Sequence, residues 1–243
     1  MLTTLNKPFS IYSLGDSAVT LDIGHLIDEQ LNEKAIAISA WLWEHTFPGL
    51  LDIIVAYSSV TIFYDPVETG KKQPAKEDSV YKYVGRLLEE AYAAVGTPVP
   101  LAPTGEPIRI PVCYGESYGP DLEELARVKS MTHEDIIRLH CSAIYRVYML
   151  GFLPGFPYLG TVDPRLETGR KQRPVPVSAG GVGIAGNQTG IYPVNSPGGW
   201  QIIGRTPVKL FDPSTTPPVK LSIGDRVQFY PVSPAEFRAL CPG

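Results

Sequence analysis

Two arginines enclose a long neutral segment of this chain. The 31 residues from Pro174 to Gly204 carry no charged side chain, and Arg173 and Arg205 flank them directly. Guanidinium groups beside backbone amides suit a carboxylate or a phosphate, because a guanidinium can donate two parallel hydrogen bonds to such a group. Strands that fold back over one another would bring Arg173 and Arg205 to one rim. This pattern predicts anion binding, and the alternative is solvated charge at two strand ends.

The neutral segment does not have the character of a membrane span. A spanning helix needs about 20 consecutive apolar residues, whereas Gly, Pro, Asn, Gln, Ser and Thr interrupt this segment repeatedly. From residue 151 to residue 207 the chain holds 12 of its 23 glycines. Glycine is needed where φ is positive or where another group approaches the backbone. We therefore expect short buried strands joined by tight turns, with backbone amides lining a site for a ligand or partner.

The segment Gly181-Val-Gly-Ile-Ala-Gly186 matches the glycine pattern of a dinucleotide site. That fingerprint must open a helix whose N-terminus receives the pyrophosphate. Gly190 and Pro193 follow within a few residues and disfavour a helix there. We interpret the pattern as a glycine-rich barrel strand and not as a nucleotide site.

His140 is the candidate catalytic side chain. It lies seven residues after His133 on a predicted helix, without a carboxylate or thiolate cluster beside it, so we predict no metal site. Its neighbours Ile136, Ile137 and Leu139 are apolar. A partly buried, hydrogen-bonded histidine is therefore the alternative to a catalytic one.

The loop Gly151-Phe-Leu-Pro-Gly-Phe-Pro-Tyr-Leu-Gly160 follows a strongly apolar strand. Its prolines and glycines make it rigid, so it can hold aromatic rings in place. We assign Phe152, Phe156 and Tyr158, with Trp200 from the neutral segment, to a pocket wall or an interface. The alternative is a hydrophobic loop that plugs one end of a barrel.

Composition excludes several classes of protein. The chain has 243 residues, 44% hydrophobic and 19% charged, which is ordinary for a globular protein. A net charge of -4 argues against nucleic-acid binding, which normally needs a basic face. The N-terminus lacks the apolar core of a signal peptide. We expect a cytoplasmic protein without a membrane span, whose three distant cysteines are reduced thiols: Cys113, Cys141 and Cys241.

Hydrophobic periodicity predicts two domains. Residues 1–96 show the order strand-strand-helix-strand-strand-helix, which suits an α+β domain with an antiparallel sheet and both helices on one face. Residues 97–107 contain four prolines and should form a stiff linker. Residues 108–243 begin with a strand at 108–114 and two short helices starting near residues 121 and 132.

From residue 144 onward only strands and turns are expected. The predicted strands include residues 208–212 and 219–222. So many short strands with Gly and Pro turns indicate an all-β domain that is a closed or nearly closed barrel.

Three segments of the chain, taken in order, carry a resemblance to one family. They are YRVYMLGFLPGFPYLG, AGGVGIAGNQTGIYPVNSPGGWQIIGRTP and LFD, and the N-terminal segment LGDSAVTLDIG agrees as well. The chain resembles the KipI/PxpB family, whose members are called a 5-oxoprolinase subunit of the PxpB type, the first subunit of allophanate hydrolase, or sensor-histidine-kinase inhibitor. This resemblance implies a small α/β domain followed by a cyclophilin-like β-barrel. The family usually has Pro-Arg and then Val-Pro-Ala-Gly-Ser-Val, where this chain has Arg173-Pro174 and then Val-Ser-Ala-Gly-Gly-Val from residue 177 to residue 182.

The resemblance also implies an activity in a complex. It points to a subunit of an ATP-dependent 5-oxoprolinase that opens 5-oxo-L-proline to L-glutamate. The implied partners are a larger KipA/PxpC-type subunit and a lactam-opening PxpA-type protein. ATP with Mg would bind at a site that the partner supplies or shares, and it would serve to phosphorylate the lactam oxygen.

For such a reaction the chain offers a carboxylate clamp and donors for a developing oxyanion. Arg173 or Arg205 would be the clamp. The remaining substrate-binding residues would be Gln188, Thr189, Tyr192, Gly198 and Gly199.

Two other functions stay open. The barrel could dock on a sensor histidine kinase and inhibit it through an apolar patch around Phe152, Phe156 and Tyr158. The chain could also be a carboxyltransferase-like or allophanate hydrolase-type subunit that acts on urea-type substrates.

Overall fold

The computed structural model describes residues 8–71, 79–97, 105–115 and 117–241. The chain divides into two compact units, Met1–Pro103 and Thr104–Gly243, here called unit 1 and unit 2. The predicted linker, residues 97–107, lies mostly outside the described residues. Each unit is therefore described by itself.

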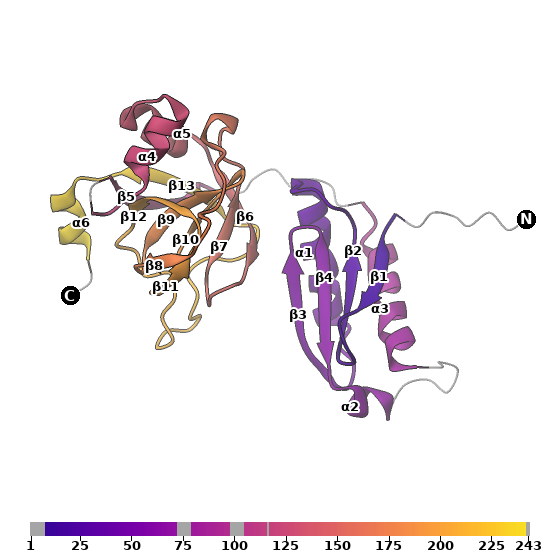
Figure 1. Cartoon of the computed structure of the whole chain (residues 1–243). Helices are drawn as coiled ribbons and strands as arrows, with labels where there is room; N and C mark the ends of the chain where they lie inside the picture. Colours follow the sequence, from indigo (N-terminus) through magenta and orange to yellow (C-terminus); the bar gives the residue numbers. More distant parts are fainter. Residues whose placement is uncertain (1–7, 72–78, 98–104, 116, 242–243) are drawn as a thin grey trace, which may run out of the picture. The chain divides into compact units, whose positions relative to one another are not determined.

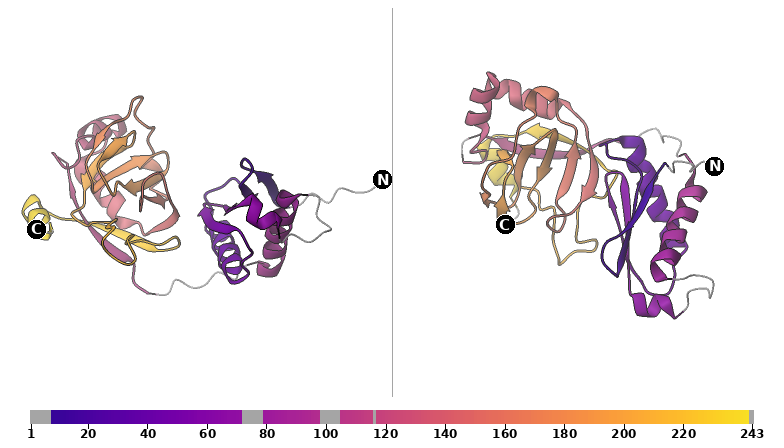
Figure 2. Two further views of the ribbon diagram at one scale, coloured as in Figure 1. Left: turned by 90° about the horizontal axis from the view of Figure 1, so that it is seen from below. Right: turned by 45° about the vertical axis from the view of Figure 1, so that its right-hand side comes forward.

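Unit 1 is a sheet covered by helices on one face (Figures 1 and 2). Its strands pair antiparallel in the order β1-β2-β4-β3. Helices α1 and α3 pack against each other and against the sheet. The strands and helices predicted for this part of the chain are confirmed, with these bounds: β1 (Ser10–Ser13), β2 (Ala18–Asp22), α1 (Glu29–Glu44), β3 (Leu50–Ala56), β4 (Ser59–Tyr64) and α3 (Val80–Val95).

One short helix of unit 1, α2 (Pro66–Gly70), replaces part of a predicted loop. The Asp65 carboxylate accepts hydrogen bonds from the backbone N–H groups of Val67 and Glu68 at 2.8 and 3.0 Å. Pro66 at the first position needs no partner, because it has no N–H. Capping by Asp65 and the fixed φ of Pro66 together stabilise this single helical turn.

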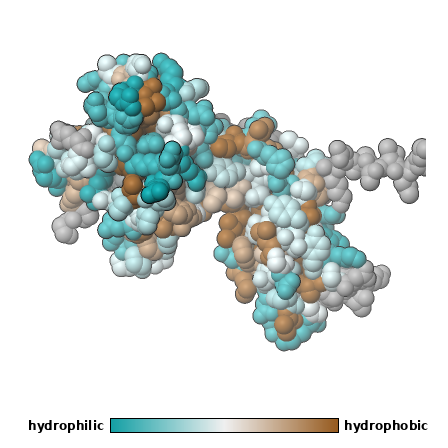
Figure 3. All heavy atoms as spheres, in the orientation of Figure 1, coloured by the Kyte–Doolittle hydropathy of each residue, from teal (hydrophilic) through white to brown (hydrophobic). Residues whose placement is uncertain are grey.

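Side chains of β4 alternate between the two faces of the sheet. Val60, Ile62 and Tyr64 are buried under the helices. On β3, Leu51 and Ile54 stay exposed, and Figure 3 shows apolar surface over this side of unit 1.

Unit 2 contains a closed barrel. In its described part, seven strands follow one another as β6-β13-β5-β12-β9-β10-β7, and the pairing of β6 with β7 closes the ring. A separate antiparallel pair, β8 with β11, lies outside this ring. The bounds are β5 (Ile108–Tyr114), α4 (Leu122–Lys129), α5 (His133–Ser142), β6 (Tyr145–Leu150), β7 (Pro157–Gly160), β8 (Val175–Val177), β9 (Gly181–Ala185), β10 (Gln188–Ile191), β11 (Ser196–Gly198), β12 (Gln201–Arg205) and β13 (Arg226–Pro231).

Both faces of β9 are buried. Val182 and Ile184 belong to the main core of unit 2, with residues of β5, β6 and α5. Ala185 belongs to a second cluster, which also contains Trp200 and Ile202. Since successive strand residues point to opposite faces, β9 has the barrel core on one side and this second cluster on the other.

The predicted barrel and the two predicted helices, α4 and α5, are confirmed, but the expectation of an all-β domain with only strands and turns from residue 144 onward is wrong. Besides α4 and α5, unit 2 has a 3-10 turn, η1 (Pro164–Leu166), and a C-terminal helix, α6 (Pro234–Leu240). The two strands predicted at residues 208–212 and 219–222 form only an isolated bridge, Phe211 with Val219. Backbone hydrogen bonds join the two segments from Asp212 to the carbonyl of Pro218 at 2.8 Å and from Lys220 to the carbonyl of Leu210 at 2.9 Å. Pro213 and Pro218 have no N–H with which to extend this pairing. The cyclophilin-like character of the barrel stays a prediction.

Candidate functional site

The outer face of the barrel carries a cluster of aromatic rings at β7, β10 and β12. The Phe156 ring lies 4.9 Å from Tyr158, 5.1 Å from Tyr192 and 5.4 Å from Trp200, measured between centroids. The contacts to Tyr192 and Trp200 are edge-to-face, the geometry that aromatic rings prefer. Gly190 of β10 makes room for this packing, because a Cβ there would lie 2.9 Å from Cζ of Phe156.

Phe152 stands over this cluster. It is 63% exposed, and its ring meets Phe156 edge-on at 5.8 Å and Tyr192 at 6.5 Å. Its φ of 69° lies in the left-handed region, which a residue with a bulky side chain rarely adopts. Such strain often accompanies functional positions. Phe156, Tyr192 and Trp200 are buried, so Phe152 and the partly buried Tyr158 are the rings of this cluster that a ligand or partner can meet. The role as a pocket wall or an interface stays a prediction.

The strand pair β8–β11 lies next to this cluster, because Gly198 of β11 is close to Tyr192. Gly198 ends β11, and any side chain there would collide with the Tyr192 phenol. Burial raises the pKa of the Tyr192 phenol, and the backbone of Trp200 opposes that rise. A Cβ at Gly199 would make only ordinary van der Waals contact, 3.8 Å from the carbonyl oxygen of Lys171, and the Gly199 carbonyl accepts a hydrogen bond from the backbone N–H of Lys171 at 2.7 Å. The predicted role of Gly198 and Gly199 as oxyanion donors stays a prediction.

The two arginines predicted as a clamp have different surroundings. Arg205 donates from Nε to the carbonyl of Ala179 at 2.8 Å, and its guanidinium lies 6.0 Å from the Phe237 ring. Arg173 is exposed just before β8. The geometry therefore assigns Arg205 to holding the turn at Ala179.

Arg170 is the arginine that lies beside the aromatic cluster. Its positive charge acts on the phenols of both Tyr158 and Tyr192. Burial raises the pKa of each phenol, and Arg170 opposes that rise. Both phenols therefore stay protonated near pH 7, and the partly exposed Tyr158 can donate a hydrogen bond to a ligand, whereas Tyr192 is buried. The sequence places Arg170 in a basic stretch but gives no sign of this contact.

His140 lies inside the barrel core and is fully buried. Its Nδ1 lies 2.8 Å from the Tyr114 hydroxyl, and its Nε2 lies 2.9 Å from the Thr189 hydroxyl. Thr189 is also fully buried and donates to the carbonyl of Gly183 at 3.0 Å. Burial lowers the pKa of His140 to about 3. Neither side chain can meet a ligand in this arrangement, so the geometry favours structural roles for both.

Gln188 lies at the first position of β10. It pairs with Gly160 of β7 and with Ala185 of β9.

The strand assignment of the glycine pattern at residues 181–186 is confirmed, since β9 ends at Ala185 and Gly186 forms a turn. Thus the structure brings together Phe152, Phe156, Tyr158, Tyr192, Gly198 and Trp200, and it places Thr189 and His140 elsewhere.

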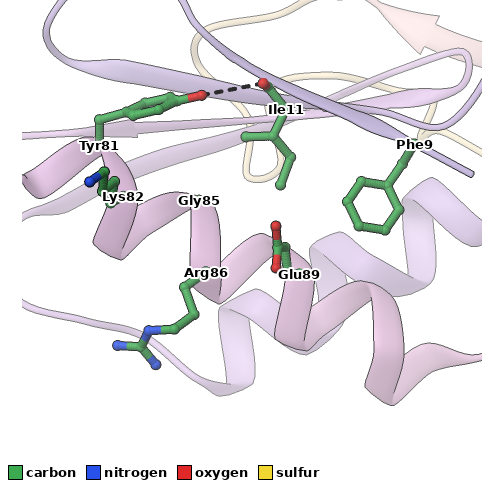
Figure 4. Close-up of a pocket in the computed structure, with 7 residues that line it drawn as sticks. All are labelled: Phe9, Ile11, Tyr81, Lys82, Gly85, Arg86 and Glu89. Carbon is green, nitrogen blue, oxygen red and sulfur yellow. Dashed lines mark hydrogen bonds between the residues drawn. The ribbon is translucent and has the colours of Figure 1, made fainter. Parts of the chain in front are cut away.

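A separate cavity of about 460 Å³ lies in unit 1 between β1 and α3 (Figure 4). Phe9 and Ile11 line it from the strand side, and the Tyr81 hydroxyl donates to the carbonyl of Ile11 at 3.2 Å. It contains no group that the sequence assigns to chemistry.

Among the described residues, no group of three or more His, Cys, Asp or Glu side chains could hold a metal ion. No helix among the residues that the structure describes is both long and apolar enough to cross a membrane.

Comparison with known proteins decides the family. Residues 9–221 match the family model "Carboxyltransferase domain, subdomain C and D". The chain is 43% identical to a 5-oxoprolinase subunit of Bacillus subtilis over 232 residues, which is 95% of this chain and 96% of that protein. The chain belongs to the KipI/PxpB family.

Solved structures agree with this membership. The crystal structure of TTHA0988 has a TM-score of 0.74 at 35% identity over 89% of this chain, which spans 40% of that protein. The urea amidolyase of K. lactis has a TM-score of 0.77 at 19% identity over 95% of this chain and 15% of that protein. The second likeness shows the fold alone.

The structure explains one departure from the pattern of the KipI/PxpB family. At residue 181 the family usually has Ser, and this chain has Gly. A Cβ at Gly181 would lie 2.7 Å from Cγ1 of Val177 and 3.0 Å from the carbonyl oxygen of Ser178. In this chain the β8 segment thus lies closer to β9 than a serine at residue 181 would allow, unless Val177 or Ser178 moved.

Proposed function

We propose that the chain is the PxpB-type subunit of an ATP-dependent 5-oxoprolinase, which opens 5-oxo-L-proline to L-glutamate. The observation that carries the proposal is the 43% identity to the 5-oxoprolinase subunit of Bacillus subtilis along 95% of this chain. The two proteins match along nearly their whole lengths. The proposed partners are a larger KipA/PxpC-type subunit and a lactam-opening PxpA-type protein.

The aromatic cluster supports a substrate that is a small ring with an anionic group. The exposed ring of Phe152 and the partly buried ring of Tyr158 offer apolar contact above the buried rings of Phe156 and Trp200. The protonated phenol of Tyr158 provides a donor, and the exposed Arg170 provides a positive charge that acts on it. The substrate 5-oxoproline combines these features, since it has a five-membered lactam ring and one carboxylate.

The described residues do not fit a magnesium–nucleotide site. The glycine-rich pattern at residues 181–186 contains the strand β9 and is not a phosphate-binding loop that opens a helix. We therefore assign ATP and Mg to the partner subunit and derive no step through them here. The role of this chain is to bind and orient the lactam.

The experiment is to produce the chain together with its two proposed partners and to measure L-glutamate and ADP formed from 5-oxo-L-proline. Activity that needs all three proteins supports the proposal. A matched preparation without this chain is the control, and urea replaces 5-oxoproline in a second control. Glutamate formation by the partners alone at the full rate would contradict the proposal. Neither kinase inhibition nor a urea-type activity gains support from the geometry, and both stay predictions.

A further inference from the structure

Strand β1 is the outermost strand of the unit 1 sheet, and among the described strands it pairs only with β2. The Leu14 N–H donates to the carbonyl of Ala18 at 2.8 Å, so the backbone groups of Leu14 face β2. Because hydrogen-bonded positions alternate along an antiparallel pair, the backbone N–H and C=O groups of Ile11 and Ser13 point away from β2. Strand β1 therefore presents an open backbone edge.

A contact from α3 shows the same direction independently. The Tyr81 hydroxyl donates to the carbonyl of Ile11 at 3.2 Å, so this carbonyl faces the helix and not β2. A carbonyl oxygen accepts two hydrogen bonds, so the N–H of an incoming strand can join the phenol there. The Tyr81 side chain is itself 38% exposed, which keeps this end of the edge accessible.

The cavity of about 460 Å³ lies along this edge (Figure 4). Tyr81 contacts Ile11 and Tyr92 contacts Phe9, so α3 runs beside β1 in the opposite direction. Gly85 opens the space between them, because a Cβ there would have the Ile11 side chain as its only neighbour within 4 Å, at 3.6 Å. An open backbone edge beside such a cavity is the arrangement that accepts an extended peptide as an added strand.

Glu89 places a negative charge in this groove. Figure 4 shows its carboxylate directed toward the strand side of the cavity, whereas Arg86 extends away from it. Arg86 also forms an ion pair with Glu90 at 2.7 Å, which offsets its charge. Lys82, the other cation that lines the cavity, lies at the Tyr81 end. A basic side chain on a bound strand therefore complements the middle of the groove.

The spacing of these groups fits an extended chain. Gly85 and Glu89 are four residues apart on α3, which is about 6 Å along the helix axis. Alternate residues of a strand are about 6.8 Å apart and point to the same face. Two alternate side chains of one bound strand can therefore meet Gly85 and Glu89 together. A helix cannot pair with the open edge, because its own backbone groups are bonded internally.

We propose that the groove between β1 and α3 binds an extended peptide segment of a partner protein, which joins the unit 1 sheet next to β1. The backbone of this segment pairs with Ile11 and Ser13. An apolar side chain lies over Gly85, and a lysine or arginine two residues away reaches Glu89. This inference goes beyond the proposed function, and its test does not depend on glutamate formation.

The test selects a phage-displayed library of random octapeptides on the full-length chain. The selected peptides should share an apolar residue two positions from a lysine or arginine. Gly85→Leu fills the cavity and should weaken their binding about 10-fold or more. Ala93→Leu is the matched control at an exposed position of α3 outside the cavity, and it should bind as wild type does. Leucine favours a helix more than glycine does, so both variants should stay folded, which circular dichroism checks.

Two further measurements test the charge and the strand pairing. Selection on Glu89→Lys should replace the basic residue of the shared pattern with aspartate or glutamate. In a selected peptide, N-methylation of the residues whose N–H groups face β1 should abolish binding, and N-methylation of the residues between them should not. Failure to enrich any peptide on wild type over Gly85→Leu would overturn the proposal. A shared pattern that Glu89→Lys leaves unchanged, or binding that tolerates N-methylation at every position, would overturn it as well.

Discussion

Nε2 of His140 lies 2.9 Å from the hydroxyl of Thr189, in the core of the barrel. Helix α5 carries the histidine and strand β10 carries the threonine, so this contact joins the helical and the strand part of unit 2. Both side chains are completely buried. The contact therefore belongs to the stability of the barrel, and it can be tested separately from ligand binding.

Stability should depend on the protonation of His140. Burial lowers its pKa from 6.5 to about 3 in the folded chain, so the unfolded chain binds the extra proton between these values. The contribution of neutral His140 is fully present above pH 6.5 and is lost as pH falls toward 3. Urea unfolding should show that the free energy of unfolding falls by up to about 1.4 kcal/mol for each pH unit across this range. The His140→Gln variant should not show this fall. Parallel curves for the two proteins would contradict a neutral, buried His140.

Thr189→Val should lower stability without changing KM. The valine has nearly the same shape but leaves His140 and the carbonyl of Gly183 without the hydroxyl. An unsatisfied buried polar group costs about 1–3 kcal/mol, which urea unfolding can measure. Thr189→Ser retains the hydroxyl and is the control. A variant of normal stability with a raised KM would instead restore Thr189 as a substrate-binding residue.

The adjacent glycines at the end of β11 should respond differently to alanine. A methyl group at Gly198 would collide with the Tyr192 phenol, whereas one at Gly199 would have its nearest neighbour at 3.8 Å. Overpacking of this kind costs about 1–3 kcal/mol. Gly198→Ala should therefore lower the melting temperature and change the near-ultraviolet circular dichroism of the aromatic cluster. Gly199→Ala is the matched control, and equal effects from both would show that Tyr192 is not packed against Gly198.

Arg205→Ala should affect the turn at Ala179 more than the substrate. It removes the 2.8 Å hydrogen bond to the Ala179 carbonyl and the packing over Phe237. Loss of one such bond lowers the free energy of unfolding by about 1 kcal/mol. KM in the assembled complex should stay within about 2-fold of wild type. A KM raised about 10-fold in a protein of unchanged stability would support the clamp that the sequence predicts.

Much of the fold could be predicted because its signals are local. The apolar stripe of α1, with Ala35, Ile38 and Leu42, follows the helical period, and Asp28 caps this helix at 2.9 Å. Helix α6 was missed although its signals are equally local. Ser233 and Glu236 form a capping box with Pro234 at the first turn, which is a recognised start of a helix.

The candidate site could be predicted only in part, because its contacts join distant residues. The rigid loop around Phe156 indicated an aromatic wall from sequence alone. The position of Arg170, by contrast, depends on Gln201, Gly199 and Asp121, which lie about 30 to 50 residues away along the chain. The full burial of His140 likewise depends on strands that come before and after it.

The most direct measurement of the central claim is glutamate release from isotopically labelled 5-oxo-L-proline by the complete complex, with ATP present and absent. The account predicts labelled glutamate only when this chain, both partners and ATP are all present. Labelled glutamate at the same rate without this chain would contradict the account, as would a complete, stable complex that forms none.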